Sequence, residues 1–137
     1  MVMARRLSVI MALLALAGCG MAPSSPPEST SSNAPAARLA DSDNGHTVSV
    51  AVGDRLEVRL QPAPGYAPWQ QAMSSDTGVL EPLPTSSSAQ QSGNTVTEFK
   101  ALRAGRADLT SFSAFACTPG SYCPAIAQTW RVTVTVG

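Results

Sequence analysis

A period of two in the apolar residues constrains this chain more than any other feature. Leucine and valine alternate with charged residues from 55 to 60, and tryptophan and valine alternate with polar residues from 129 to 136. Valine alternates in the same way with small or polar residues from 47 to 52. Because successive side chains of a strand point to opposite faces, each pattern predicts a strand with one face on a core and the other in water.

Shorter strands are expected at residues 69–74, 79–83, 95–102 and 107–116, separated by glycine and proline at turn positions. No segment has a convincing helical period. Seven short strands in one small domain are typical of an antiparallel β-sandwich with immunoglobulin-like architecture. The cysteine–tryptophan–cysteine signature of true immunoglobulin domains is absent, so the prediction is the all-β architecture alone.

The N-terminus has the three-part layout of a secretory signal peptide. Arg5 and Arg6 precede an apolar run over residues 7–16, which is too short for a membrane span of roughly 20 residues. The Leu-Ala-Gly that leads into Cys19 resembles the lipobox of bacterial lipoproteins; the alternative is an ordinary signal peptide with an incidental cysteine. The resemblance implies cleavage after residue 18 and a lipid on Cys19. It places the protein on the extracytoplasmic side of a membrane, the outer membrane in a Gram-negative host.

Residues 19–43 are expected to form a lipidated linker, and residues 44–137 a single folded domain. Serine and proline dominate the linker, which has too little apolar surface to offset the entropy cost of ordering. Beyond the signal peptide, seven basic residues face nine acidic ones. The sequence has no cluster of basic residues that would indicate nucleic acid as a partner.

Cys117 and Cys123 are the only cysteines left once Cys19 carries lipid. Exported cysteines usually pair, so we expect a disulfide that stiffens the loop between them. A metal site is the alternative. Two cysteines at this spacing with the distant His46 would give it too few ligands, so no metal is expected.

Enzymatic chemistry finds little support in the residues. His46 is the only histidine, and no nucleophile elbow, phosphate loop or dinucleotide fingerprint is present. The acidic residues fall in turns or on outward strand positions, where nothing would separate their pKa values. The sequence therefore predicts a binding or structural module that uses no cofactor.

The segment 61–69 holds three prolines, a glycine, a tyrosine and a tryptophan. Prolines lower the conformational freedom of a loop, so this one can present its backbone rigidly. Tyr66 and Trp69 are large enough to anchor a partner. The pattern favours a core position for Trp69, as for a strand-C tryptophan, and leaves Tyr66 open between the two roles. Trp130 alternates with core valines and is expected to pack.

Pro62, Gly65, Tyr66 and Trp69 match the first binding loop of chagasin-type inhibitors of papain-like cysteine proteases, whose motif is Asn-Pro-Thr-Thr-Gly-Tyr-x-Trp. Gln61 replaces the asparagine, and one extra residue precedes the tryptophan. The flanking framework agrees, so the resemblance covers about residues 46–137. It implies three loops at one end that plug the protease cleft, matched here by residues 61–69, 84–94 and 117–128.

The chain departs from that pattern in each loop. Pro64 replaces the second threonine of the motif, and only Ser92, Gly93 and Asn94 resemble the glycine-rich second loop. In the third loop, Cys117, Thr118, Pro119 and Gly120 stand in place of the family's Arg-Pro-Trp. The resemblance thus implies a membrane-tethered inhibitor of papain-like cysteine proteases. The alternative is a non-inhibitory immunoglobulin-like surface or adhesion module that binds another envelope or extracellular protein.

Overall fold

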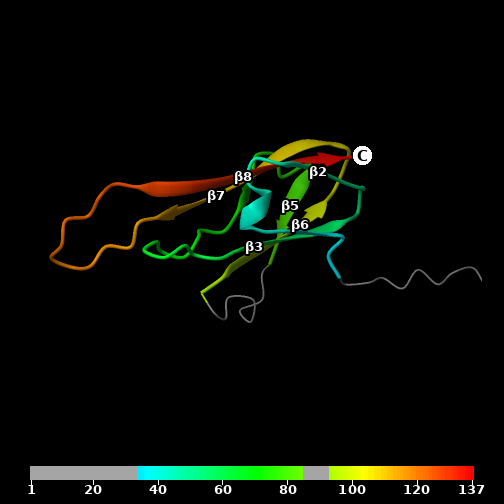
Figure 1. Cartoon of the computed structure of the whole chain (residues 1–137). Helices are drawn as coiled ribbons and strands as arrows, with labels where there is room; N and C mark the ends of the chain where they lie inside the picture. The colour runs from blue at the N-terminus through cyan, green and yellow to red at the C-terminus, as the bar shows by residue number, and fades with distance from the viewer. Residues whose placement is uncertain (1–33, 85–92) are drawn as a thin grey trace, which may run out of the picture. The chain divides into compact units, whose positions relative to one another are not determined.

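The computed structural model describes residues 34–84 and 93–137, and these contain two four-stranded β-sheets (Figure 1). In spatial order, the first sheet contains β1 (Ala37–Leu39), β3 (Arg55–Leu60), β6 (Thr95–Ala101) and β5 (Leu80–Leu83). The second contains β2 (Thr47–Val50), β8 (Ala127–Val136), β7 (Gly105–Ala114) and β4 (Met73–Ser74). A 3₁₀ helix, η1 (Asp41–Asp43), lies in the connection between β1 and β2. The all-β sandwich predicted from the sequence is confirmed.

The pairing within the sheets corrects the expectation of a purely antiparallel sandwich. The pairs β3–β6, β5–β6, β7–β8 and β4–β7 are antiparallel, whereas β1 runs parallel to β3 and β2 runs parallel to β8. Both parallel strands lie at the edge of their sheet and come from the N-terminal part of the domain. Each is joined to its neighbour by a connection longer than a hairpin turn, as parallel neighbours require.

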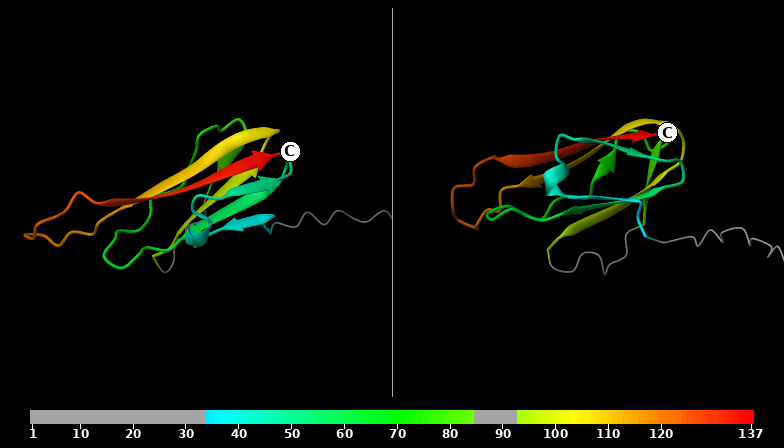
Figure 2. Two further views of the ribbon diagram at one scale, coloured as in Figure 1. Left: turned by 45° about the horizontal axis from the view of Figure 1, so that its top comes forward. Right: turned by 45° about the vertical axis from the view of Figure 1, so that its right-hand side comes forward.

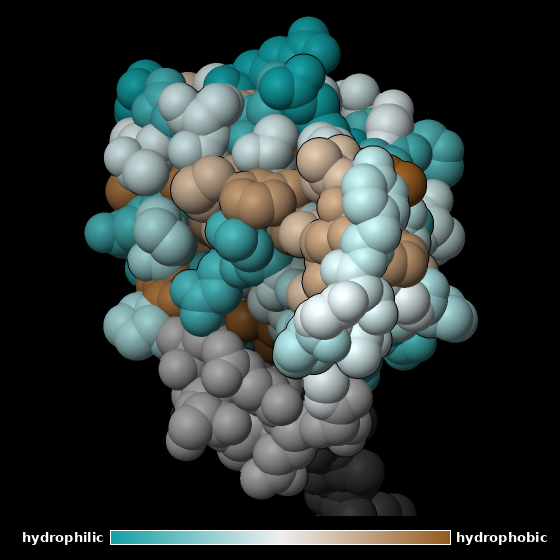
Figure 3. All heavy atoms as spheres, turned by 90° about the vertical axis from the view of Figure 1, so that its left-hand side faces the viewer, coloured by the Kyte–Doolittle hydropathy of each residue, from teal (hydrophilic) through white to brown (hydrophobic). Residues whose placement is uncertain are grey.

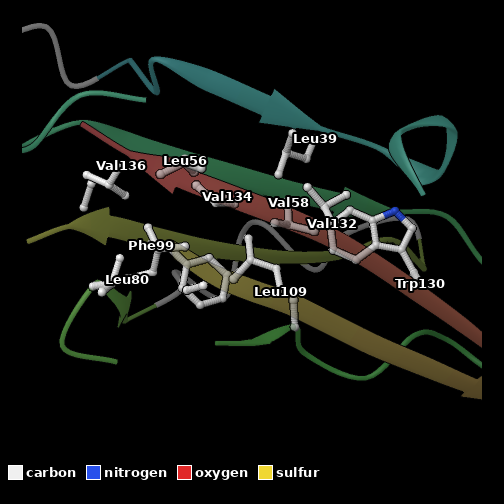
Figure 4. Close-up of a cluster of buried hydrophobic side chains, with 14 of the residues drawn as sticks. Leu39, Leu56, Val58, Leu80, Phe99, Leu109, Trp130, Val132, Val134 and Val136 are labelled. Carbon is white, nitrogen blue, oxygen red and sulfur yellow. The ribbon is translucent and has the colours of Figure 1, made fainter. Parts of the chain in front are cut away.

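The core forms between the two sheets from the inward residues of the alternating segments. Leu56, Leu80, Leu109, Val132 and Val134 have no exposed surface. Figure 4 shows Leu39, Phe99 and Trp130 among the side chains that fill the same interior. Trp130 is 1% exposed, and its indole nitrogen donates a hydrogen bond to the carbonyl oxygen of Ala40 at 2.9 Å. The packing role expected for Trp130 is therefore confirmed.

The domain begins earlier than the boundary expected at residue 44. β1 pairs with β3, and Leu39 is only 3% exposed within the core. Asp41 then accepts a hydrogen bond from the backbone N–H of Gln61 at 3.0 Å. One buried leucine and a few backbone bonds are enough to order a segment whose composition resembles a linker.

Two other strand boundaries differ from the prediction. Regular pairing of β4 is confined to Met73 and Ser74. Just before it, the backbone N–H of Ala72 donates to the hydroxyl of Thr97 in the other sheet at 3.1 Å, so the ladder with β7 does not continue. β2 ends at Val50, and Val52 is 51% exposed where the chain turns toward β3.

Within the described residues, no helix has the length and apolar character to cross a membrane.

The domain has two distinct ends. The chain enters near the start of β3, where the backbone N–H of Ala36 donates to the carbonyl oxygen of Arg55 at 2.8 Å. The C-terminal Gly137 bonds to Val50 at the same end. The β3–β4 connection and the β7–β8 hairpin project from the opposite end, as Figures 1 and 2 show from three directions.

Candidate functional site

The tip of the first loop (residues 61–69) is a tight turn. The backbone N–H of Tyr66 donates to the carbonyl oxygen of Ala63 at 3.0 Å, and Gly65 has φ +84°. Proline at the second position and a left-handed glycine at the third define a type II turn. Pro64 removes a hydroxyl and a backbone donor relative to the motif, but it fixes φ where this turn needs it. Both Pro64 and Gly65 are exposed.

The base of the first loop is closed by Trp69. Its indole nitrogen donates to the carbonyl oxygen of Gln61 at 2.9 Å, so the ring joins the two arms of the loop. Thr95 donates from its hydroxyl to the carbonyl oxygen of Trp69 at 2.6 Å. Trp69 is 8% exposed and belongs to the core. The core interpretation of Trp69 is confirmed, and within the first protease-binding loop expected from the sequence its buried ring supports the loop from inside.

The first loop and residues 114–116, which lead from β7 into the third loop, form one hydrogen-bonded ribbon. The N–H of Ala67 donates to Ala114 O, and the N–H of Ala116 donates to Gly65 O, each at 2.9 Å. Tyr66 forms a β-bridge with Phe115, and their rings meet edge to face with centroids 5.6 Å apart. Tyr66 is half-buried in this contact. It therefore fixes the two loops to each other and also keeps part of its surface open to a partner.

The third loop (residues 117–128) is held by the disulfide expected between Cys117 and Cys123, which is confirmed. Inside the disulfide ring is a second proline–glycine turn. The N–H of Ser121 donates to the carbonyl oxygen of Thr118 at 3.1 Å, and Gly120 has φ +84°. Thr118, Pro119 and Gly120 are all exposed. The last two residues of this loop, 127 and 128, are already part of β8.

The second loop (residues 84–94) is described at Pro84, Gly93 and Asn94. Ser92 lies outside the described residues, whereas Gly93 and Asn94 lie beside the first loop. A Cβ atom on Gly93 would be 4.0 Å from Cγ of Pro62. Gly93 and Asn94 also line a shallow hollow together with Pro68 and Trp69. The structure thus brings the first loop, the third loop and the described end of the second loop to one end of the sandwich.

This end has a distinctive surface chemistry. None of the three loops contains an aspartate, glutamate, lysine, arginine or histidine. Figure 3 looks onto the end and shows apolar surface gathered across its middle, between more hydrophilic margins. A partner would be recognised here by shape, apolar contact and backbone hydrogen bonds, with little electrostatic steering. His46 is exposed near η1 and belongs to none of the loops.

The fold has a solved counterpart. The cysteine protease inhibitor EhICP2 from Entamoeba histolytica superimposes with a TM-score of 0.52 at 15% sequence identity, over 76% of this chain and 100% of that chain. The domain shares the fold of this inhibitor. The fold implied by the resemblance to chagasin-type inhibitors is thereby confirmed.

Looser matches are amebosin and PbICP-C, the latter solved in complex with falcipain-2. Amebosin gives a TM-score of 0.45 at 18% identity over 76% of this chain and 100% of its own. PbICP-C gives 0.41 at 16% identity over 73% of this chain and 89% of its own. No family model matches the sequence, and no curated protein matches it significantly.

One residue of the site was missed from the sequence. Tyr122 follows the second proline–glycine turn and is 92% exposed, the largest exposed fraction among the exposed large hydrophobic residues. The signal available was an aromatic residue inside a short disulfide ring, directly after a turn. The family motif pointed to Thr118, Pro119 and Gly120 instead.

Proposed function

We propose that this domain inhibits papain-like cysteine proteases by inserting the loops at one end of the sandwich into the active-site cleft. The observation that carries the proposal is the turn Ala63–Tyr66. It is exposed at its tip, closed by a backbone hydrogen bond, and supported from inside by Trp69, on a fold shared with a cysteine protease inhibitor. A rigid loop loses little conformational entropy on binding and adapts poorly to the geometry needed for cleavage.

The rest of the loop end supports the same proposal. The ribbon between the first and third loops fixes their spacing, and the surface that they present is uncharged and partly apolar. Pre-organised protease inhibitors bind tightly through interfaces of standard size for this reason. Pro62 and Gly93 extend the surface on the side of the second loop.

The deciding experiment is inhibition of papain by the purified chain from residue 20 to residue 137. Papain is activated with thiol and desalted before mixing, so that the Cys117–Cys123 disulfide stays intact. We expect reversible inhibition at micromolar concentration or below. A folded sample that leaves papain fully active at micromolar concentration would show that the proposal is wrong.

A second candidate is a surface module that binds another extracytoplasmic protein through the same loops. The disulfide-closed third loop favours it, because that loop lacks the Arg-Pro-Trp that the resemblance to inhibitors would require. Affinity capture from the host envelope separates the two. A papain-like protease recovered on wild-type protein supports the inhibitor, whereas one reproducible non-protease partner supports the module.

We further propose that a lipid on Cys19 anchors the protein to the extracytoplasmic face of a membrane. The signal-peptide layout and the Leu-Ala-Gly before Cys19 support this proposal, and the entry point of the chain is compatible with it. The chain enters the domain beside Arg55 at the start of β3, and the first loop leaves after Leu60 at its end. A strand of this length spans roughly 17 Å. A tether would therefore attach at the end of the domain opposite the loops and would not cover them.

Cys19→Ser is expected to release the protein from the membrane. In a bacterial host that processes lipoproteins, the wild type should incorporate labelled palmitate and partition into detergent, because two or more acyl chains give stable anchoring. The variant should remain unlabelled and enter the aqueous phase. Cys117→Ser serves as the control for loss of a cysteine and should still be labelled. Equal labelling of wild type and Cys19→Ser would refute the anchor.

A further inference from the structure

The third loop extends further than any other described part of the loop end. The β7–β8 ladder ends at the pair Ala114–Ala127, and one more backbone bond joins Phe115 to Ile126. Beyond that point the hairpin continues past the first loop, as Figure 1 and the left-hand view of Figure 2 show most clearly. A partner whose cleft receives the first loop would therefore also contact the third loop, on the surface beside that cleft.

This projecting loop is pre-organised by two constraints. The disulfide closes it at Cys117 and Cys123, and the turn from Thr118 to Ser121 folds the ring between them. Proline at the second turn position and left-handed glycine at the third repeat the geometry of the first loop. Two loops with the same rigid turn indicate that both tips hold a defined shape before any partner arrives.

Tyr122 is the side chain that this constrained ring presents. It is 92% exposed, directly after the turn and next to the disulfide. A tyrosine supplies a large contact area with only two rotatable bonds, and it can also hydrogen-bond through its hydroxyl. Such residues are enriched among those that dominate binding energy. No charge on this loop or on the first loop competes with apolar contact.

We propose that Tyr122 determines which protease the domain binds, by entering an apolar pocket beside the cleft that receives the first loop. The inference rests on the proposed inhibitory function. The first loop offers mainly backbone and a half-buried tyrosine, which suit features common to many clefts. Tyr122 offers one large side chain at a separate position, and it responds to surface features that differ between proteases.

The test compares inhibition constants against papain and two further papain-like proteases that differ in the apolar character of the surface beside the cleft. All enzymes are activated and desalted as above. Tyr122→Ala is expected to raise the inhibition constant about 10- to 100-fold for the protease that binds wild type most tightly. The change should be less than about threefold for the weakest, so the variant loses discrimination. Tyr122→Phe should keep most of the discrimination, and Val52→Ala, which removes exposed apolar surface near the β2–β3 turn, should behave as wild type.

The thermal midpoint should not change in Tyr122→Ala, because the exposed ring makes no core contact. A second variant, Cys117→Ser with Cys123→Ser, keeps Tyr122 but opens the ring. It should lose part of the same discrimination, because the tyrosine must then be ordered on binding. Equal inhibition constants for wild type and Tyr122→Ala against all three proteases would overturn the inference alone. If the wild type inhibits none of them, the proposed function fails and this inference fails with it.

Discussion

Gly65→Glu is expected to abolish inhibition of papain, with the inhibition constant rising more than about 100-fold, the range seen when a central binding residue is lost. Gly65 has φ +84°, which a residue with a Cβ adopts only at a cost of about 1–2 kcal/mol. Its Cβ would also stand 3.4 Å from Cε2 of Phe115, on the ring that joins the first and third loops. The carboxylate would enter an uncharged surface and lose its hydration on binding.

The chain offers a closely matched control in Gly53→Glu. Gly53 has φ +92°, a Cβ atom there would meet nothing within 4 Å, and the residue lies in the β2–β3 turn at the end opposite the loops. The same charge and a similar backbone cost should lower the thermal midpoint of both variants by a few degrees. Inhibition should survive in Gly53→Glu only. Retained inhibition in Gly65→Glu, or equal loss in both, would show that the first loop does not enter the cleft.

Alternation of apolar residues was sufficient to predict the central strands. The inward residues of β3 and β8 are those that the period of two selects, because burial on one face of a strand leaves that period in the sequence. The same pattern carries no information on strand direction. β2 and β8 pair in parallel, and nothing in valines at every second position separates parallel from antiparallel neighbours.

Short elements at the edge were beyond sequence reasoning. β1 has three residues, and its one buried side chain, Leu39, follows a long stretch without apolar periodicity. A single leucine gives no period, so composition assigned the segment to the linker. The strand expected at residues 69–74 is longer than β4 itself. Trp69 and Ala72 are buried, as strand residues would be, but regular strand pairing does not include them.

In the candidate site, some features follow from the sequence and others depend on the folded domain. Turn chemistry is local, so the rigid tip at Pro64 and Gly65 follows from the sequence, and the disulfide follows from the cysteine count. The direction of a side chain in a proline-rich loop is not local. Trp69 turns inward because Gln61 and Thr95 accept and donate the hydrogen bonds that hold it there, and these contacts exist only in the folded domain. Tyr122 is exposed because the loop closed by the Cys117–Cys123 disulfide contains too few residues to cover its side chain.

A chain that begins at residue 44 is expected to be much less stable than one that begins at residue 34. The longer chain keeps β1, whose Leu39 is buried against the core, and burial of one such side chain contributes about 1.5–3 kcal/mol. The shorter chain also leaves the buried indole N–H of Trp130 without the Ala40 oxygen, at a cost of about 1–3 kcal/mol. Together these losses are a large part of the roughly 5–15 kcal/mol that stabilises a typical domain.

Thermal unfolding of three chains, beginning at residues 20, 34 and 44, measures the effect. The first two should unfold at the same temperature, because the removed residues precede β1. The third should unfold at least about 15 °C lower, since 1 kcal/mol shifts the midpoint of a domain of this size by roughly 4–8 °C. Leu39→Ala in the longest chain should reproduce about half of the loss, which would assign it to the core contact. The loops should be affected as well, because Asp41 no longer holds the backbone of Gln61 at the base of the first loop. Weaker inhibition by the shortest chain, at a temperature where it is still folded, would therefore show that β1 and η1 help to position the binding surface. An unchanged thermal midpoint would instead show that residues 34–43 contribute nothing to the stability of the domain and act only as linker.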